Sequence, residues 1–227
     1  MSMTLNPVNE AAFQKAVQSL ETLNRAAVFH PTGTGKSCIA WKVVEAHPQT
    51  TFFWLVAGAQ RLALRQAELT RYNGGTLPGN VRFCDCEKLA AATPEQWVRL
   101  GEQKPGCVVL DCYHELSAVC WAQSVQKLLR MCPQAKVLGL GVPNGAPVCA
   151  AAQELFADCI VSHMTVAEAM AAGTMPVPSA YAALLWPQEE ELATLRARIK
   201  NLCMPKGDTS LRVQYEELSW SLRQVEN

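Results

Sequence analysis

A chain of 227 residues, of which 49% are hydrophobic, is long enough to bury the core of a globular domain and too apolar for a disordered protein. Lysine plus arginine balances aspartate plus glutamate at 20 residues each, so the chain lacks the positive excess of many nucleic-acid-binding proteins. Any contact with nucleic acid is therefore expected to be local and weak.

Neither a membrane span nor a secretion signal is predicted. The longest apolar runs, such as Thr51–Ala59, and shorter ones such as Cys107–Leu110 fall far below the roughly 20 residues that a transmembrane helix needs. Met1–Leu5 lacks a basic segment followed by an apolar core. We therefore predict a cytoplasmic protein without membrane contact, whose ten cysteines are reduced and mostly buried.

Short apolar runs alternate along the chain with longer amphipathic segments. Several runs are almost wholly apolar, as expected when helices cover both faces of a parallel sheet. The predicted strands are Ala26–Phe29, Thr51–Val56, Asn80–Cys84, Cys107–Leu110, Lys136–Leu140 and Asp158–Val161. This alternation predicts an α/β three-layer domain with a mostly parallel sheet.

Two amphipathic segments follow the first two strands and are predicted to be helices on the sheet. The first begins after Lys36 and ends before Pro48, and the second covers Gln60–Tyr72, where Leu62, Leu64 and Leu69 are the apolar positions. The composition of Asn73–Gly79 predicts a loop, and that of Thr93–Gln96 a capped helix start.

The segment between the first strand and the first helix has the sequence of a phosphate-binding loop. It reads His30-Pro31-Thr32-Gly33-Thr34-Gly35-Lys36-Ser37, with His30 in place of the first glycine of the general consensus. The two glycines let the backbone turn tightly and direct its N–H groups at phosphate oxygens. We predict that the loop binds ATP, that Lys36 reaches the β- and γ-phosphates, and that Ser37 offers its hydroxyl to Mg²⁺.

A second motif follows the fourth predicted strand, where an apolar run ends in an acid. Asp111 is predicted to hold Mg²⁺, directly or through water. His114 follows three positions later, and the combination of acid, histidine and phosphate loop is much more specific than any part alone.

Together these motifs resemble those of superfamily 2 helicases, and more closely a bacterial group of DEAD/DEAH-box helicase proteins. Asp111 and His114 match the second motif of the family, and the resemblance extends over nearly the whole chain. It implies a RecA-like P-loop NTPase domain, which we assign to residues 1–186. Residues 187–227 are predicted to form a C-terminal helical extension, because Leu192, Leu195 and Ile199 form one apolar stripe in a charged segment. The resemblance also implies that Asn9 lies on the adenine side of the nucleotide and that Lys36, Asp111 and His114 form the catalytic set.

Three departures from the family pattern bear on activity. Cys112 replaces the acid that orients the attacking water, and Gly141-Val142-Pro143 replaces the hydroxyl-containing third motif. The chain also ends before any second RecA-like domain, which in the family supplies an arginine finger. We therefore expect weak or partner-dependent hydrolysis, a requirement for a second RecA-like domain or partner chain, and weak nucleic-acid contact in which DNA is favoured over RNA.

Alternative interpretations remain open at this stage. The chain is an ATP-binding helicase module, a catalytically degenerate P-loop protein that binds nucleotide as a structural or regulatory ligand, or another P-loop class such as a kinase. Arg61, Arg65 and Arg71 are interpreted as a solvated helix face or, alternatively, as contacts to nucleic-acid phosphates.

Overall fold

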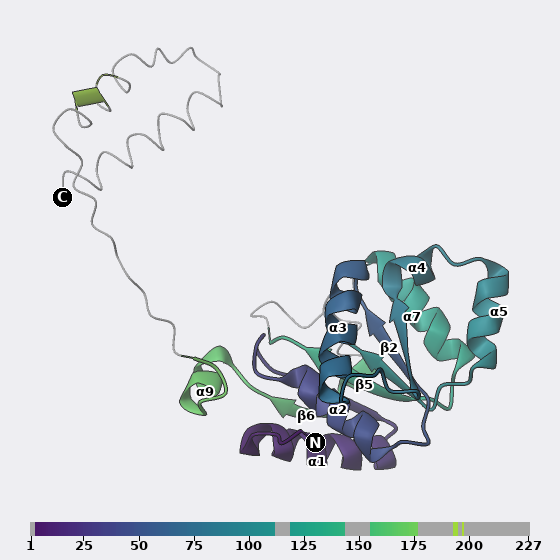
Figure 1. Ribbon diagram of the computed structural model, residues 1–227, viewed down its shortest axis with the longest axis horizontal. Helices are drawn as coiled ribbons and strands as arrows, with labels where there is room; N and C mark the ends of the chain where they lie inside the picture. Colours follow the sequence, from purple (N-terminus) through teal and green to yellow (C-terminus); the bar gives the residue numbers. More distant parts are fainter. Residues whose placement is uncertain (1–2, 112–118, 144–154, 177–192, 195–196, 198–227) are drawn as a thin grey trace. The chain divides into compact units, whose positions relative to one another are not determined.

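The computed structural model describes residues 3–111, 119–143, 155–176, 193–194 and 197 (Figure 1). The chain divides into two compact units, Met1–Val177 and Pro178–Asn227. The predicted boundary after residue 186 and nearly all of the predicted helical extension lie outside the described residues, so both stay predictions. Everything below concerns the first unit.

The first unit is built on a six-stranded sheet in the order β3-β2-β4-β5-β1-β6, and all neighbouring strands are parallel. The strands are β1 Arg25–Phe29, β2 Phe52–Val56, β3 Val81–Asp85, β4 Cys107–Leu110, β5 Lys136–Gly141 and β6 Ile160–His163. All six predicted strands are confirmed, with ends within two residues of the expected positions.

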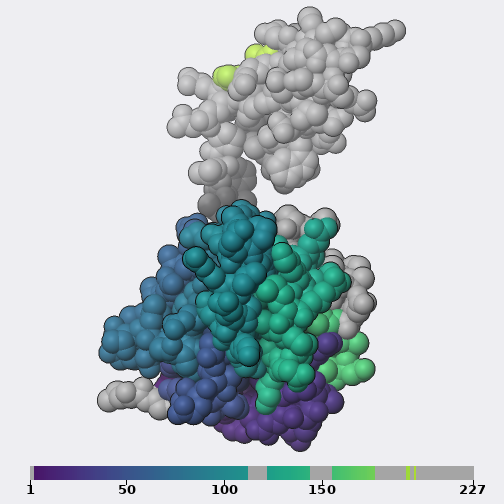
Figure 2. Space-filling view, turned by 90° about the vertical axis from the view of Figure 1, so that its right-hand side faces the viewer, coloured from purple at the N-terminus to yellow at the C-terminus, as the bar shows by residue number. Residues whose placement is uncertain are grey.

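Helices cover both faces of this sheet. One face carries α1 Pro7–Thr22, α2 Lys36–Ala46 and α3 Ala59–Tyr72, and the other carries α4 Cys86–Ala90, α5 Pro94–Glu102 and α7 Val119–Met131. A short helix, α9 Val166–Ala171, follows β6. In the space-filling view, the teal and green parts of the chain that contain α4, α5 and α7 adjoin one another on the surface (Figure 2).

The core consists of two hydrophobic clusters separated by the sheet. Alternate residues of one strand enter opposite clusters: on β2, Phe52 and Trp54 pack with α1 and α2, whereas Phe53 and Leu55 pack with α5 and α7. All five residues of β2 are buried. The three-layer α/β architecture predicted from the uninterrupted apolar strands is therefore confirmed.

The predicted helices are also present, with one correction. α2 and α3 occupy the expected segments, and Thr93 caps α5 through a reciprocal capping box with Gln96. Leu64, however, does not pack on the sheet, because its side chain is 61% exposed. It follows Leu62 by two positions, which turns it about 200° around the helix and away from the packed face.

The described cysteines are free thiols, as expected for a reduced protein. Cys84, Cys86, Cys107 and Cys132 are buried, and burial raises the pKa of the first three to about 12. These thiols therefore stay protonated near neutral pH and act as small core residues.

In the described part of the chain, no helix is both long and apolar enough to cross a membrane.

Because all strands are parallel, their carboxyl ends lie along one edge of the sheet. The loops that follow β1, β2 and β4 open at this edge.

Candidate nucleotide-binding site

The phosphate loop joins β1 to α2 and depends on two glycines with left-handed backbone conformations. Gly33 has φ +88° and Gly35 has φ +90°. A Cβ atom on Gly35 would lie 2.8 Å from the side-chain nitrogen of Asn9, so this position excludes larger residues for two reasons. Gly35 is also the N-cap of α2. Because glycine has no side chain to cap the helix, no capping side chain blocks the N–H groups of the first turn, which lie at the phosphate loop.

Hydrogen bonds within the loop hold it in shape. The Lys36 Nζ donates to the carbonyl oxygens of His30 and Pro31, each at 2.8 Å. Thr34 is 2% exposed, and its hydroxyl donates to the Pro31 carbonyl oxygen at 2.8 Å. Pro31 and Thr34 therefore shape the loop from within, whereas Thr32 and Gly33 are exposed at its opening.

Asn9 supports the loop from α1. Its side chain is 3% exposed, and its Nδ2 donates to the Thr34 carbonyl oxygen at 2.8 Å. Its Oδ1 is buried without a hydrogen-bond partner among the described residues. Asn9 does not belong to the residues that line the pocket at the loop, so the observed contact is with the loop backbone.

His30 is buried completely at the start of the loop. A hydrogen bond of 2.8 Å joins its Nε2 to the Ser162 hydroxyl on β6, and its backbone N–H donates to the Gly141 carbonyl oxygen at 3.1 Å. Burial, followed by the charges of Lys36 and His163, lowers the pKa of His30 to about 4. The imidazole is therefore neutral near pH 7 and ties the loop to the strands on both sides of β1.

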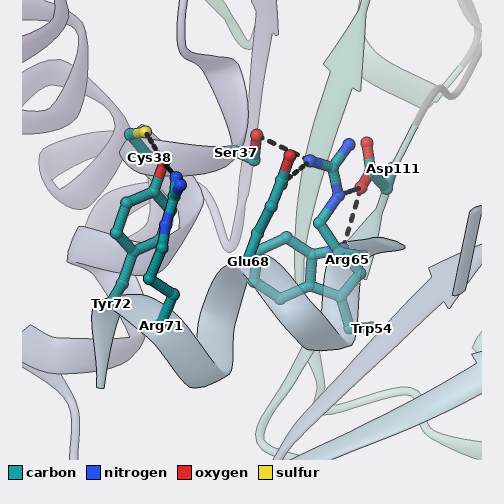
Figure 3. Close-up of polar contacts among 8 residues, drawn as sticks. All are labelled: Ser37, Cys38, Trp54, Arg65, Glu68, Arg71, Tyr72 and Asp111. Atoms are coloured by element: carbon teal, nitrogen blue, oxygen red, sulfur yellow. Dashed lines mark hydrogen bonds and ion pairs between the residues drawn. The ribbon is translucent and has the colours of Figure 1, made fainter. Parts of the chain in front are cut away.

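Asp111 stands at the carboxyl end of β4 and is 2% exposed. Its Oδ2 accepts a hydrogen bond from Trp54 Nε1 on β2 at 3.1 Å and another from Arg65 Nε on α3 at 2.6 Å (Figure 3). Trp54 is fully buried, so its indole holds the carboxylate from the side of the core. The acid predicted from the strand end thus lies in a defined polar setting.

Arg65 joins this acid to the phosphate loop. Its Nη1 donates to Ser37 Oγ at 2.8 Å and also contacts Glu68, one turn further along α3 (Figure 3). Burial alone would lower the pKa of Arg65, but the Asp111 and Glu68 carboxylates raise it above its ordinary value. The guanidinium is therefore a permanent cation between Ser37 and Asp111.

The three arginines grouped in the sequence have different positions. Arg65 lies in the site with a side chain that is 21% exposed, so the prediction of a solvated face is wrong for it. Arg61 lines the same pocket. Arg71 is exposed and lies over the Tyr72 ring at 5.0 Å. Helical periodicity placed all three on polar positions but could not show which one faces the loop.

An open pocket of about 540 Å³ lies between the phosphate loop, α3 and the end of β4. Its lining residues are Thr32, Gly33, Gly35, Lys36, Ser37, Cys38, Arg61, Leu64, Arg65, Glu68, Tyr72, Asp111 and Val142. Most of the residues predicted to bind nucleotide are thus brought together. His114 and Cys112 lie outside the described residues, so their predicted roles stay predictions.

Ser37 and Asp111 have the chemistry expected of a magnesium site. Both present hard oxygen atoms, and both contact the guanidinium of Arg65, Ser37 through Nη1 and Asp111 through Nε. Mg²⁺ is usually bound by one or two protein oxygens together with substrate phosphates. Among the described residues, no group of three or more His, Cys, Asp or Glu side chains could hold a metal ion.

The glycines of β5 have a packing role that the sequence did not reveal. A Cβ on Gly139 would lie 2.7 Å from the Phe156 ring, and one on Gly141 would overlap the Phe29 ring. Gly141 is the first residue of the segment that replaces the third motif, and the Phe29 ring fills the space that a side chain at this position would need. Val142, the next residue, lines the pocket.

The sheet order, the phosphate loop and the acid at the end of β4 together define the α/β fold of P-loop ATPases. No protein-family model matches the chain, and no curated protein is significantly similar to it in sequence. Two solved structures are similar to this chain in fold, each with a TM-score of 0.53.

The first is the ATP-dependent type ISP restriction-modification enzyme LlaBIII bound to DNA, which is 12% identical. The match covers 76% of this chain and 16% of that chain. The second is the Sulfolobus solfataricus SWI2/SNF2 ATPase core in complex with double-stranded DNA, which is 11% identical, with 99% of this chain and 58% of that chain covered. The chain thus has a RecA-like P-loop fold and spans less than two thirds of either structure.

Proposed function

We propose that this chain is the ATP-binding module of a helicase or translocase of the DEAD/DEAH type, with weak or partner-dependent hydrolysis. The observation that supports this most directly is the convergence of Lys36, Ser37 and Asp111 on one pocket at the carboxyl edge of the sheet. Ligands of open α/β sheets bind at this edge. The left-handed glycines and the N-terminus of α2 add backbone donors suited to phosphate.

The pocket residues would divide the work of holding ATP. Lys36 and the loop N–H groups would bind the β- and γ-phosphates, and Thr32 to Gly35 would enclose them. Ser37 and Asp111 are the side chains that would hold Mg²⁺ in this pocket, provided that Arg65 left both oxygen atoms. His114 completes the proposed catalytic set, and Cys112 in place of a carboxylate would make turnover slow.

Nucleic-acid contact is proposed to be weak and to involve DNA. The two similar structures contain DNA, but the chain spans only part of each, so a second RecA-like domain or a partner chain is proposed to complete the motor. The isolated chain should bind DNA mainly through phosphates, and this binding should weaken steeply as salt rises. It should not displace strands, and strand displacement by the pure protein would contradict the proposal.

The assignment is tested by nucleotide-dependent thermal stabilisation of the wild type, Lys36→Ala and Lys42→Ala. Saturation at about 100 times the dissociation constant should add roughly 2.7 kcal/mol to the wild-type stability. Lys36→Ala should abolish the shift because its ammonium lies at the loop. Lys42 lies on the same helix and pairs with Glu45, so Lys42→Ala should keep the shift. Equal shifts in all three proteins would refute the site.

A second candidate function is favoured by the position of Arg65. Because this guanidinium engages both proposed magnesium ligands, the chain is also suited to hold nucleotide as a structural or regulatory ligand. Phosphate release measured with and without DNA separates the two functions. Turnover stimulated by DNA or by a partner supports the motor module, whereas stabilisation by ATP without any turnover supports the regulatory role.

A further inference from the structure

The guanidinium of Arg65 lies between two oxygen atoms that a P-loop protein normally offers to a metal. Its Nη1 is 2.8 Å from Ser37 Oγ, and its Nε is 2.6 Å from Asp111 Oδ2 (Figure 3). Mg²⁺ binds its oxygen ligands at about 2.0–2.1 Å and demands near-octahedral geometry. Arg65 in this position and a metal on the same two oxygens therefore exclude one another.

Several contacts hold Arg65 in this position. Glu68 contacts the same Nη1 from one turn along α3, and Trp54 fixes Asp111 from the buried side. The helix itself is anchored by Leu69, which is 1% exposed in the core. Release of the guanidinium would leave the carboxylate of Asp111, a residue that is 2% exposed, with the Trp54 indole as its one side-chain donor among the described residues. A metal that displaces Arg65 must first compensate for the ion pair that Asp111 loses, and this cost lowers the affinity of the site for the metal.

The charges in the pocket also suit a nucleotide without a metal. Lys36, Arg61 and Arg65 bring three cations to the pocket, and Asp111 and Glu68 bring two carboxylates. A planar guanidinium with five N–H donors keeps donor capacity after it has bound Ser37 and Asp111. It can therefore contact phosphate oxygens while it retains both protein partners.

We propose that Arg65 takes the place of Mg²⁺ at Ser37 and Asp111, so that this pocket binds nucleoside di- and triphosphates with little dependence on a divalent metal. The inference rests on the proposed nucleotide site and specifies its ligand as the metal-free nucleotide. Arg65 is the residue that determines this specificity, through competition with the metal for the same two oxygens.

The test compares the dissociation constants of ADP and of a non-hydrolysable ATP analogue in Mg²⁺ and in EDTA, measured by calorimetry. The wild-type constants should agree within about threefold, whereas Arg65→Met should bind about tenfold more weakly in EDTA than in Mg²⁺. Methionine keeps most of the side-chain length but removes the charge and the donors. Arg71→Met, on the same helix and outside the pocket lining, should behave as the wild type.

A second measurement separates this inference from the proposed function. Mn²⁺ is titrated into nucleotide-free protein, and the free ion is followed by electron paramagnetic resonance. Arg65→Met should bind Mn²⁺ about tenfold more tightly than the wild type, because Ser37 and Asp111 are then released. Arg65→Met combined with Asp111→Asn should lose this gain. If nucleotide fails to bind but this pattern holds, the proposed function is lost and the competition by Arg65 stands.

The opposite results overturn the inference. A wild type that binds nucleotide about tenfold more tightly in Mg²⁺ than in EDTA shows that the metal displaces Arg65 readily. Equal Mn²⁺ affinity of the wild type and Arg65→Met has the same meaning, and both results leave the nucleotide site intact. If Arg65→Met does not fold, as judged by circular dichroism, Arg65→Gln and Arg65→Lys take its place. Gln should reproduce the metal dependence, and Lys should give an intermediate value.

Discussion

The two halves of the pocket are built in different ways. The phosphate loop is made by one continuous segment, in which Gly33, Gly35 and Lys36 define the backbone and its internal hydrogen bonds. The end of β4 is made by side chains from three separate elements, with Trp54 on β2, Arg65 on α3 and Asp111 after β4. A local motif therefore reveals the first half, whereas the second depends on which side chains the fold brings together.

This difference decides where substitutions act. In the loop, the backbone conformation and its supports determine whether phosphate donors are formed at all. At the end of β4, the ionic partners of Asp111 would determine which cation lies beside the phosphates of a bound nucleotide. The following predictions test this division, in order from the largest expected effect to the smallest.

Gly35→Ala should have the largest effect, because the loop is defined by its backbone. A non-glycine residue in the left-handed region costs about 1–3 kcal/mol, and the new Cβ would also meet Asn9. We expect a loss of about 3 kcal/mol in unfolding free energy by chemical denaturation, together with weaker nucleotide binding. In an Asn9→Ala background the same change should cost less, since the steric part is removed. Equal costs in both backgrounds would show that Asn9 does not restrict the loop.

His30→Gln, at the start of the phosphate loop, should make the free energy of unfolding less dependent on pH. Folded His30 has a pKa of about 4, below the unfolded value of 6.5, so the unfolded chain binds more protons between these values. The contribution of His30 to stability is therefore complete above pH 6.5 and is lost as pH falls towards 4. The wild type should lose about 2 kcal/mol more than His30→Gln over this window. Denaturation curves that fall in parallel for both proteins would contradict this.

Cys112→Glu tests whether a missing carboxylate alone limits ATP hydrolysis at the end of β4. Assistance by a general base is worth about 10²–10⁴-fold, but the substituted third motif and the proposed need for a second domain limit the gain to about tenfold. Steady-state phosphate release is compared at equal nucleotide saturation, with Lys36→Ala as the background control. Wild-type turnover of about 1 s⁻¹ or faster, unchanged in Cys112→Glu, would mean that another residue positions the water.

Asn9→Ala should have the smallest effect on its own. It removes one buried hydrogen bond to the Thr34 carbonyl oxygen and also removes the Oδ1 that has no described partner. A net loss of about 1 kcal/mol in stability is expected, with a modest weakening of nucleotide binding. Loss of binding without any loss of stability would instead support the direct nucleotide contact expected for Asn9.

The sequence predicted most of the fold because its signals are periodic or local. Continuous apolar strands identified a parallel sheet, and Pro31–Ser37 identified the phosphate loop from its own residues. Asp111 followed from its place at a strand end. Arg65 could not be recognised in the same way, because its polar helix position looks the same whether it faces solvent or a carboxylate 46 residues away. The fit of Phe29 and Phe156 over the β5 glycines likewise depends on contacts between distant segments.

The place of β1 in the sheet has a consequence for the order of folding. β1 carries the phosphate loop near the start of the chain, yet both of its neighbours come late, since Arg25 pairs with Val137 and Ala27 pairs with Ile160. At a synthesis rate of about 5–20 residues per second, β1 waits roughly 5–20 s for its first partner to leave the ribosome. Throughout that delay its buried residues stay without their native strand contacts. The strands β2, β3 and β4 leave the ribosome before β5 and β6 do, so they can pair with one another before β1 has either of its neighbours.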